Sequence, residues 1–476
     1  MSELPKKSTA FFEWYNEVLE RAQVTDKRYP VKGLNVWPPF GLSIRSNFDR
    51  TLRSAVEAIG YQEVSFPTLI PETELKKESE HIKGFEAEVY WVTKGGATPL
   101  DINLCLRPTS ETAMYPMFAL WVRSHKDLPL RIFQICNVFR YETKSTRPLI
   151  RIREIHFYEG HTVHPTEESA TRQVQEDLGS FAEIARAFAL PYLINKRPDW
   201  DKFPGAHYSL ALDIPFGDGR TLQVGTVHHY RDNFARPYGI QYETEQGGSA
   251  FGHQTTYGIS ERLIGGVIGV HGDDKGLVLP PALAPTQVVV IPVIGKGSKE
   301  AVEGAAKEIA ASLSASGFRT KVDLSEDRPG AKYYAWESRG VPLRVELGPR
   351  EVEEKAATLA DRFGRKRKVA RSDLVEEVRK DLDAFHAALS EKATTRFREQ
   401  IGVASTLAEL KGARSVHLIG WCGKEECGHQ IEAGVEGGLL GTVEASSPEG
   451  ILPGEAPPCI VCEGTPSRWS AAGRPL

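Results

Sequence analysis

Over roughly the first 285 residues, hydrophobic and polar positions alternate in short segments that come in neighbouring pairs. Segments 131–142 and 149–161 form one pair, 209–214 and 221–229 form another, and short polar loops join the members of each. Paired strands with helices elsewhere are typical of an antiparallel sheet in an α+β domain. Near the start of the chain, apolar residues recur at helical spacing and predict a docked amphipathic helix: Phe11, Phe12, Tyr15, Val18, Leu19 and Ala22.

A different pattern begins after the proline-rich segment 279–285, which we interpret as a linker. Apolar, β-branched runs at 287–294, 318–324 and 342–347 alternate with predicted helices at 298–315 and 331–338. This alternation predicts a small α/β domain with a mainly parallel sheet. A long polar helix, 371–400, and a cysteine-containing segment complete the chain. We therefore expect three domains, with boundaries 1–285, 286–400 and 401–476.

The overall composition is that of an ordinary globular protein. Of 476 residues, 41% are hydrophobic and 26% are charged, and the formal net charge is −4, which excludes a disordered or fibrous chain. The longest apolar run, 263–270, is too short to cross a bilayer. The N-terminus carries acids and lacks the apolar core of a signal peptide. These features predict a cytoplasmic protein with no membrane partner.

Positive charge is concentrated in two stretches in spite of the negative total. Residues 140–153 contain five basic residues and one acid, and residues 344–371 contain nine basic residues and five acids. Each stretch alone is compatible with a solvated surface. Two basic stretches in different domains are also what a single large polyanion, such as a nucleic acid, would contact.

Four of the six cysteines are grouped near the C-terminus in two closely spaced pairs. Two such pairs can present four thiolates to one Zn²⁺, and because no coordination position stays open, the site would be structural. Two disulfides are the alternative, which a cytoplasmic location and the chain size disfavour. His429 could replace one ligand, a less favoured arrangement. The predicted ligands are Cys422, Cys427, Cys459 and Cys462, whereas Cys105 and Cys136 lie in apolar contexts typical of a core.

The segment around Arg140 and Arg151 carries the most chemical information. A strand that ends in Arg140, a basic loop and a returning strand with Arg151 would form a hairpin with two guanidinium groups, which suit phosphate oxygens and carboxylates. Structural salt bridging is the alternative. The chain has no GxxxxGK[ST] and no GxGxxG between a strand and a helix, so an ATP site here would be neither P-loop nor Rossmann. Period-two alternation places these side chains on one face: Arg151, Arg153, Ile155, Phe157, Glu159 and His161.

These motifs resemble the class II aminoacyl-tRNA synthetases. The Arg140/Arg151 hairpin resembles their motif 2, residues 258–265 (GISERLIG) resemble motif 3, and the stretch from 37–41 (WPPFG) to 63–67 (EVSFP) resembles motif 1, which forms the dimer. More narrowly, segments 107–111, 159–161, 223–229 and 271–281 are similar to the prolyl-tRNA synthetases of the archaeal and eukaryote-like form. The resemblance implies a class II catalytic domain on an antiparallel sheet, then an α/β anticodon-binding domain and a small zinc-binding α/β C-terminal domain.

The resemblance also implies an activity and its partners. The expected reaction is ATP-dependent ligation of L-proline to tRNA(Pro) through prolyl-adenylate by a homodimer, with Mg²⁺ accompanying ATP and with structural Zn²⁺. Arg140 is the expected catalytic residue. The implied proline site comprises Thr109, Glu111, Arg140, Phe157, His161, His228 and Ser260. The implied ATP site comprises Arg140, Glu142, Arg151, Ile155, Gln223, Thr226 and Arg262. The implied anticodon contacts are Glu346, Arg350, Asp361, Arg362 and Lys366.

Several of these residues also have simpler interpretations. Thr109 could cap the helix that follows Pro108, Ser260 could cap a turn, and His161 and His228 could be core histidines.

Three departures from the family pattern stand out. Ile155 occupies the place of an aromatic ring that stacks on adenine. Glu261 replaces a neutral residue of motif 3 and adds a negative charge beside the phosphate ligands. Leu476 ends the chain where relatives often have a tyrosine whose carboxylate reaches the catalytic domain, which puts that contact in doubt.

The sequence further predicts the absence of one activity. The stretch between His161 and His207 is too short for the editing insertion of the bacterial form, so we expect no clearance of Ala-tRNA(Pro).

The rival interpretations are a class II ligase for threonine, serine or glycine, a non-catalytic paralogue that binds tRNA or a partner, and a zinc-ribbon regulator. Threonine recognition would require a catalytic zinc site in the core, for which the sequence offers no Cys/His/His set, and the acidic cysteine segment argues against a regulator that binds nucleic acid.

Overall fold

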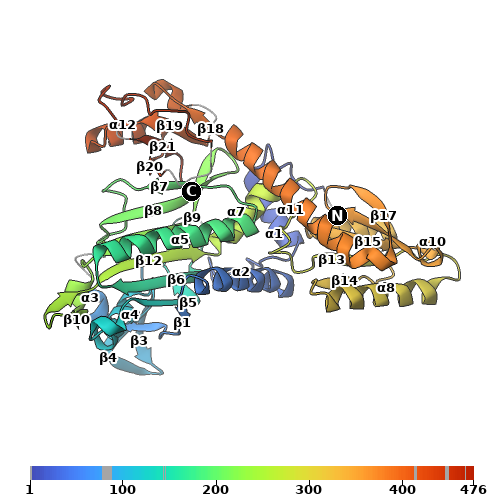
Figure 1. The fold of residues 1–476 in the computed structure, drawn as a ribbon, viewed down its shortest axis with the longest axis horizontal. Helices are drawn as coiled ribbons and strands as arrows, with labels where there is room; N and C mark the ends of the chain where they lie inside the picture. The colour runs from blue at the N-terminus through green and yellow to red at the C-terminus, as the bar shows by residue number, and fades with distance from the viewer. Residues whose placement is uncertain are drawn as a thin grey trace.

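The computed structural model describes residues 3–77, 88–142, 144, 146–411, 415–444, 450–466 and 468–476. The chain forms three units (Figure 1). The first unit is built around a large sheet, the second has a five-stranded sheet beside the long helix α11, and the C-terminal unit packs on the far edge of the large sheet. No helix in the described part of the chain is long and apolar enough to span a membrane.

The large sheet has eleven described strands in the order β1-β5-β6-β12-β9-β8-β7-β20-β21-β19-β18, and it is parallel only at its two outermost pairs. Its N-terminal part is antiparallel, as the paired segments of the sequence predict. These strands are β1 (Gln62–Glu63), β5 (Leu130–Phe139), β6 (Glu154–His164), β7 (Leu193–Lys196), β8 (Tyr208–Phe216), β9 (Arg220–Arg231) and β12 (His253–Ser260).

Helices cover one face of this sheet and leave the other face to the pocket described below. Helix α5 (Glu167–Ala187) packs against β9, β12 and β6, with Val174, Phe181 and Ile184 fully buried. The predicted N-terminal helix is α1 (Phe11–Arg21), whose buried face includes Trp14 and Val18. Together with α2 (Pro39–Glu57) and α7 (Arg262–His271), these helices share one hydrophobic core with the sheet.

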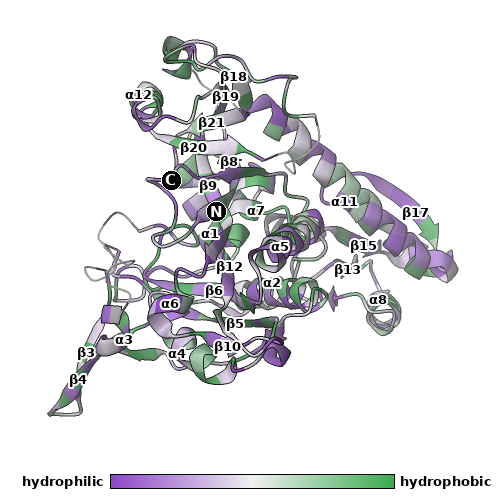
Figure 2. Ribbon diagram, turned by 60° about the vertical axis from the view of Figure 1, so that its left-hand side comes forward, coloured by the Kyte–Doolittle hydropathy of each residue, from purple (hydrophilic) through white to green (hydrophobic). Residues whose placement is uncertain are grey.

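Smaller elements surround the lower edge of the sheet. Strands β3 (Trp91–Gly95) and β4 (Thr98–Leu106) form a hairpin that projects from the body (Figure 2). The others are β2 (Leu69–Pro71), α3 (Glu72–Lys77), α4 (Glu111–Trp121), α6 (Ala235–Tyr238), β10 (Gln241–Glu243) and β11 (Ser249–Phe251).

The second unit has a mixed sheet where the sequence predicts a mainly parallel one. Strand β13 (Val288–Pro292) is parallel to β14 (Thr320–Val322) and β15 (Leu343–Leu347), but β15 continues antiparallel through β16 (Ala356–Asp361) to β17 (Lys366–Ala370). The sequence pattern missed this last hairpin because β17 is an edge strand with lysine and arginine at three of its five positions. The helices are α8 (Lys299–Ala315), α9 (Pro329–Ser338), α10 (Pro349–Glu353) and α11 (Leu374–Glu399).

The C-terminal unit adds strands to the large sheet and does not build a sheet of its own. Strand β20 (Gly438–Val443) pairs with β7, with Thr442 opposite Lys196. Strands β21 (Trp469–Gly473), β19 (Val416–Gly420) and β18 (Ile401–Val403) follow, and α12 (Glu425–Val435) packs on β20. Leu476 donates its backbone N–H to the Thr221 carbonyl at 2.9 Å and packs on the core of the first unit. Leu476 therefore contacts the first unit directly.

Two residues expected at the anticodon are buried, and one of them, Arg362, lies at the junction between the first and second units. The Arg362 side chain is 1% exposed and donates to both carboxylate oxygens of Asp273, at 2.7 and 3.1 Å, and to the carbonyl of Glu337 at 2.8 Å. The Asp361 carboxylate accepts from the backbone of Phe363 and Arg365. Both side chains are buried with partners inside the protein, which disfavours their role as anticodon contacts.

Candidate active site

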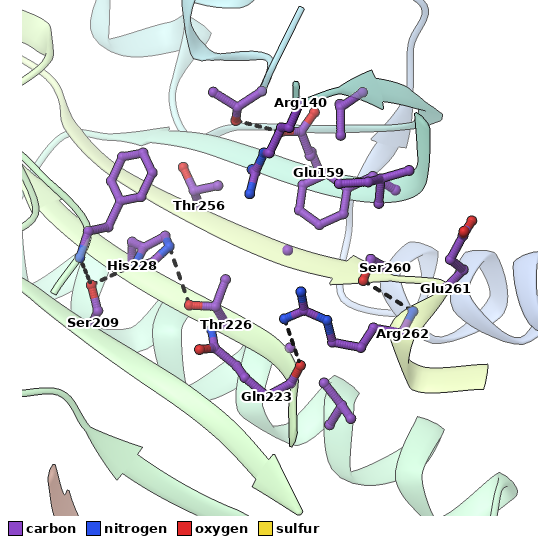
Figure 3. A pocket seen from close by; sticks show the side chains of 18 of the residues that line it. Arg140, Glu159, Ser209, Gln223, Thr226, His228, Thr256, Ser260, Glu261 and Arg262 are labelled. Atoms are coloured by element: carbon purple, nitrogen blue, oxygen red, sulfur yellow. Dashed lines mark hydrogen bonds between the residues drawn. The ribbon is translucent and has the colours of Figure 1, made fainter. Parts of the chain in front are cut away.

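One cavity of about 390 Å³ opens on the uncovered face of the large sheet (Figure 3). Its walls come from β6, β9 and β12, from the end of β5 and from the start of α7. Of the implied proline and ATP residues, all except His161 line it. They are Thr109, Glu111, Arg140, Glu142, Arg151, Ile155, Phe157, Gln223, Thr226, His228, Ser260 and Arg262. Segments separated by more than 150 residues thus converge on one site.

Three arginines line the cavity. Arg140 follows the last residue of β5 and donates its Nε to the Pro108 carbonyl at 3.1 Å. Arg262 begins α7 and donates its Nε to the Ile150 carbonyl at 3.0 Å. Burial and the positive charges of Arg140 and Arg151 lower the pKa of Arg262 to about 10. Three guanidinium groups that repel one another in a partly desolvated space are stabilised by an anionic ligand.

Carboxyl groups line another part of the cavity, within electrostatic range of Arg140. Glu111 and Glu159 are buried, and the Thr109 hydroxyl lies between them, 2.7 Å from an oxygen of Glu159. Glu159 also accepts from the backbone N–H and the hydroxyl of Ser110. Burial, and then the charge of Glu111, raises the pKa of Glu159. Two adjacent buried carboxyl groups favour a cationic ligand.

Thr109 is therefore a lining residue and does not cap the helix. Helix α4 begins at Glu111, its N-cap position is Ser110, and no side chain provides a capping hydrogen bond there. The hydroxyl of Thr109 instead bridges the two carboxylates.

The two histidines lie in different places. His228 lines the cavity, with Nδ1 2.7 Å from the Ser209 hydroxyl and Nε2 3.3 Å from the Thr226 hydroxyl (Figure 3). Burial lowers its pKa to about 4, so its ring is neutral at pH 7. His161 is fully buried behind the wall, with Nδ1 3.3 Å from the Thr256 hydroxyl, while its Nε2 makes no hydrogen bond to any described residue. His161 lies within 4.8 Å of the ligand atoms of Glu111 and Glu159.

In the segment that resembles motif 3, the surroundings of the Glu261 carboxyl group affect its charge. The Glu261 side chain points away from the Arg262 guanidinium (Figure 3), and its Oε2 accepts from the His156 backbone N–H at 2.9 Å. Burial raises the pKa of Glu261 to about 8, so the carboxyl is mostly neutral at pH 7. Burial therefore reduces the negative charge that the sequence alone suggests beside the phosphate ligands. The Ser260 hydroxyl accepts from the Arg262 backbone N–H at 3.2 Å and also faces the cavity.

Two sets of lining residues were missed from the sequence. Glu159 lies on the predicted face of β6 but was given no role, although its alternation with Phe157 was a usable signal. Segment 197–204, which follows β7, contributes Arg197, Asp201, Lys202 and Phe203. Its signal was a polar, proline-containing loop directly after a strand, a common location for binding residues.

The four C-terminal cysteines meet at a second site. Their sulfur atoms all lie within 4.8 Å of one another, and Sγ of Cys462 is 3.6 Å from Sγ of Cys422. All six cysteines of the chain are free, so the disulfide alternative is not realised. Tetrahedral coordination with Zn–S bonds of about 2.3 Å requires sulfur separations near 3.8 Å, which this spacing fits. Although burial opposes ionisation, hydrogen bonds from backbone N–H groups lower the pKa of Cys459 to about 7. His429 instead pairs with Glu425 and Glu432.

Two family models match the chain. Residues 90–271 match the tRNA synthetase class II core domain (G, H, P, S and T), and residues 287–381 match an anticodon binding domain. The first match contains the cavity and the second contains the mixed sheet.

Curated relatives match over nearly the whole length. The chain is 55% identical to a proline--tRNA ligase of Thermococcus kodakarensis over 458 residues, which cover 94% of this chain and 95% of the relative. It is 53% identical to the proline--tRNA ligase of Methanosarcina mazei, with 92% of each chain covered.

Solved structures agree with this match. The prolyl-tRNA synthetase of Giardia lamblia in complex with prolyl-adenylate superposes with a TM-score of 0.94 at 34% identity, covering 100% of both chains. The enzyme of Cryptosporidium parvum complexed with halofuginone and AMPPNP gives a TM-score of 0.91 at 33% identity over 99% of both chains.

Proposed function

Because the chain belongs to the proline--tRNA ligases of class II, we propose how its cavity joins L-proline to tRNA(Pro) through a prolyl-adenylate. The observation that carries the assignment of roles is that one cavity holds both signs of charge: Arg151 and Arg262, the buried carboxyl groups of Glu111 and Glu159, and Arg140, which interacts with those carboxyl groups. Proline has a cationic secondary ammonium and an anionic carboxylate, and ATP adds phosphates. Each charged group of the two substrates therefore has an oppositely charged partner in the cavity.

The buried carboxyl groups bind the proline ammonium. Glu111, Glu159 and the hydroxyl of Thr109 converge in the cavity, and a cation relieves the repulsion between the two carboxyl groups. Phe157 and the neutral ring of His228 flank the pyrrolidine ring. His161 supports this wall from behind through Thr256, and Ser260 reaches the junction with the nucleotide.

The arginines bind ATP and stabilise the charge of the transition state. Arg140 interacts with the carboxyl groups and would contact both the proline carboxylate and the α-phosphate as the bond between them forms. Arg262 and Arg151 hold the remaining phosphates, and Gln223, Thr226 and Ile155 border the nucleotide. A carboxylate is already a nucleophile, so the protein contributes positioning and electrostatics and needs no general base.

Two metal ions complete the proposal. Glu142, beside Arg151, and Gln223 are the groups placed to accompany Mg²⁺ with ATP, and this ion would neutralise phosphate charge. Cys422, Cys427, Cys459 and Cys462 would hold one structural Zn²⁺.

The second unit would bind the anticodon of tRNA(Pro) through Arg350, Lys366 and Glu346. Arg350 is 80% exposed, and Lys366, which is 45% exposed, pairs at 2.8 Å with Glu346, whose side chain is 14% exposed. These three residues remain the proposed contacts.

We further propose that the protein works as a homodimer in the cytoplasm. Exposed apolar side chains cluster in and beside the segment that resembles motif 1, and an apolar surface of this kind favours burial against a second copy: Tyr29, Val31, Val36 and Leu42. A cytoplasmic location follows from the reaction, because ATP and tRNA are its substrates.

Proline-dependent ATP–pyrophosphate exchange tests the assignment. We expect Arg140→Ala to lower the exchange rate by about 10²–10³-fold, because the variant lacks a donor at the developing charge. Arg186→Ala is the matched control, since Arg186 lies on the outer face of α5 with 68% of its side chain exposed, and it should exchange like the wild type. A folded, magnesium-replete wild type without exchange activity would refute the proposal.

A further inference from the structure

The segment between β7 and β8 connects the C-terminal unit to the active site. It leaves β7, the strand that pairs with β8 on one side and with β20 of the C-terminal unit on the other. The backbone approach at this seam is close: a Cβ on Gly441, which has a φ of +116°, would lie 2.0 Å from the Lys196 carbonyl oxygen. The segment then turns into the cavity, which Arg197 and Phe203 line.

Arg197 joins the C-terminal unit and the cavity through a single guanidinium group. Its Nη1 donates to the Leu440 carbonyl of β20 at 2.8 Å, and its Nη2 donates to Oε1 of Gln223 at 3.0 Å and to Asp213 at 2.9 Å. The side chains of Arg197 and Asp213 are only 9% and 2% exposed. Because the guanidinium is planar and rigid, the position of Leu440 constrains the orientation of the Gln223 amide.

Trp200 anchors the middle of the segment on the C-terminal unit. Its Nε1 donates to Glu432 of α12 at 3.1 Å, and its ring lies against Trp421 and His429, with centroids 5.8 and 4.9 Å away. The ring also covers Gly428, where a Cβ would approach it to 2.4 Å. Gly428 directly follows Cys427, so Trp200 contacts the helix that carries one of the four clustered cysteines.

Phe203 ends the connection at the cavity wall. Its ring packs on His228, with centroids 4.8 Å apart, and its backbone N–H donates to the Ser209 hydroxyl at 2.9 Å. That hydroxyl is also 2.7 Å from Nδ1 of His228. The position of Phe203 therefore controls both a wall of the cavity and the hydrogen bond that orients the His228 ring.

We propose that the C-terminal unit is a positioning element of the active site, acting through Arg197 on Gln223 and through Trp200 on the contact between Phe203 and His228. Trp200 and Arg197 are positioning residues. The inference rests on the proposed assignment of Gln223 to the nucleotide and of His228 to proline, and it gives the cysteine unit a role in substrate binding in addition to stability.

The test measures KM for ATP and for proline separately in the exchange reaction of the full-length protein. Arg197→Gln should raise KM for ATP about tenfold, and Trp200→Ala should raise KM for proline about tenfold, each with a smaller effect on kcat and on the other KM. Arg197→Lys should recover part of the ATP effect, since an ammonium retains a donor for Gln223. Trp200→Phe should recover part of the proline effect, since the ring contact with Gly428 remains.

The controls separate positioning from unfolding. Arg186→Gln, on the exposed face of α5, should behave like the wild type, and thermal unfolding establishes that each variant is folded. If Arg197→Gln fails to fold because Asp213 loses its cationic partner, Trp200→Ala still tests the proposal.

Values of KM within twofold of the wild type in the folded variants would overturn the inference and leave the proposed function standing. A uniform loss of kcat with both KM values unchanged would also overturn it. An inactive wild type would instead overturn the proposed function, and the inference with it.

Discussion

Buried carboxyl groups in this protein have two different surroundings. Glu159 lies beside Glu111 in the cavity, where burial raises its pKa and a cationic ligand favours the ionised form. Glu261 also borders the cavity, but its side chain points away from the Arg262 guanidinium and accepts a hydrogen bond from a backbone N–H. The first carboxyl group can bind a cationic ligand, whereas burial favours the neutral form of the second.

Ionisation of Glu261 should make the folded protein less stable as the pH rises. Its pKa rises from 4.5 in the unfolded chain to about 8 in the folded protein. Between these values the folded protein binds more protons than the unfolded chain, so this group's contribution falls as pH rises, by up to about 1.4 kcal/mol per pH unit, and levels off above pH 8. Arg45, which lowers the pKa, and Glu154 and Asp49, which raise it, act on the same group.

Glu261→Gln should remove this contribution, because an amide of the same shape cannot ionise. Denaturant unfolding at pH 6 and pH 8 should show a smaller loss of stability across that interval in the variant than in the wild type. Equal losses in the two proteins would show that Glu261 is ionised in the folded state across the whole range.

At the scale of elements, the four cysteines join a loop, a helix and a turn of the C-terminal unit. Cys427 lies in α12, Cys422 follows β19, and Cys459 and Cys462 come from the loop before β21. A metal would hold these pieces together where the unit has only a small core of its own.

Metal analysis of the purified chain tests this arrangement. We expect about one zinc per chain in the wild type and little in Cys459→Ser, because three thiolates leave the coordination incomplete. His429→Ala is the matched control: His429 is exposed and paired with acids, so zinc should be retained. Loss of zinc in His429→Ala would restore the alternative in which this histidine is a ligand.

The element between His161 and His207 bears on editing. This stretch consists of the end of β6, helix α5, strand β7 and the segment that returns to β8. A hydrophobic pocket separates ligands that differ by one methylene by only about 10–200-fold, so alanine should be activated to some extent. We expect the pure protein to leave Ala-tRNA(Pro) intact in a deacylation assay, and rapid hydrolysis would contradict this.

At the scale of the whole molecule, Arg362 connects the second unit to the first through hydrogen bonds and an ion pair. It binds the carboxylate of Asp273 and the carbonyls of Leu277 and Glu337 from a buried position. Asp273 immediately follows α7 and its C-cap, so the junction is continuous with the helix whose first residue is Arg262 in the cavity.

Arg362→Ala should destabilise the protein by about 2–4 kcal/mol, because carbonyls and a carboxylate lose their donor; the partial exposure of Asp273 keeps the effect below that of a fully buried pair. Arg365→Ala is the matched control, since the Arg365 side chain is 58% exposed and surface pairs contribute at most about 1 kcal/mol. Urea unfolding compares the two. Equal stability of both variants would mean that the junction does not depend on Arg362.

The sequence determined what is local or periodic. Alternation along β6 placed Ile155, Phe157 and Glu159 on one face, helical spacing gave α1, and the motif residues identified a cavity that the fold then assembled. Cysteine spacing predicted a four-thiolate cluster. Each of these follows from chemistry within a few neighbouring residues or from a motif that carries its own spacing.

Tertiary structure decided everything that depends on which distant segments meet. The charged residues of β17 hid an antiparallel hairpin, Arg362 forms a buried ion pair between the first and second units, and burial raises the pKa of Glu261. The pairing of β20 with β7, which brings the cysteine unit to Gln223 through Arg197, has no periodic signal in the sequence. Burial and the pairing of strand edges are properties of the assembled chain, because each is set by residues hundreds of positions apart.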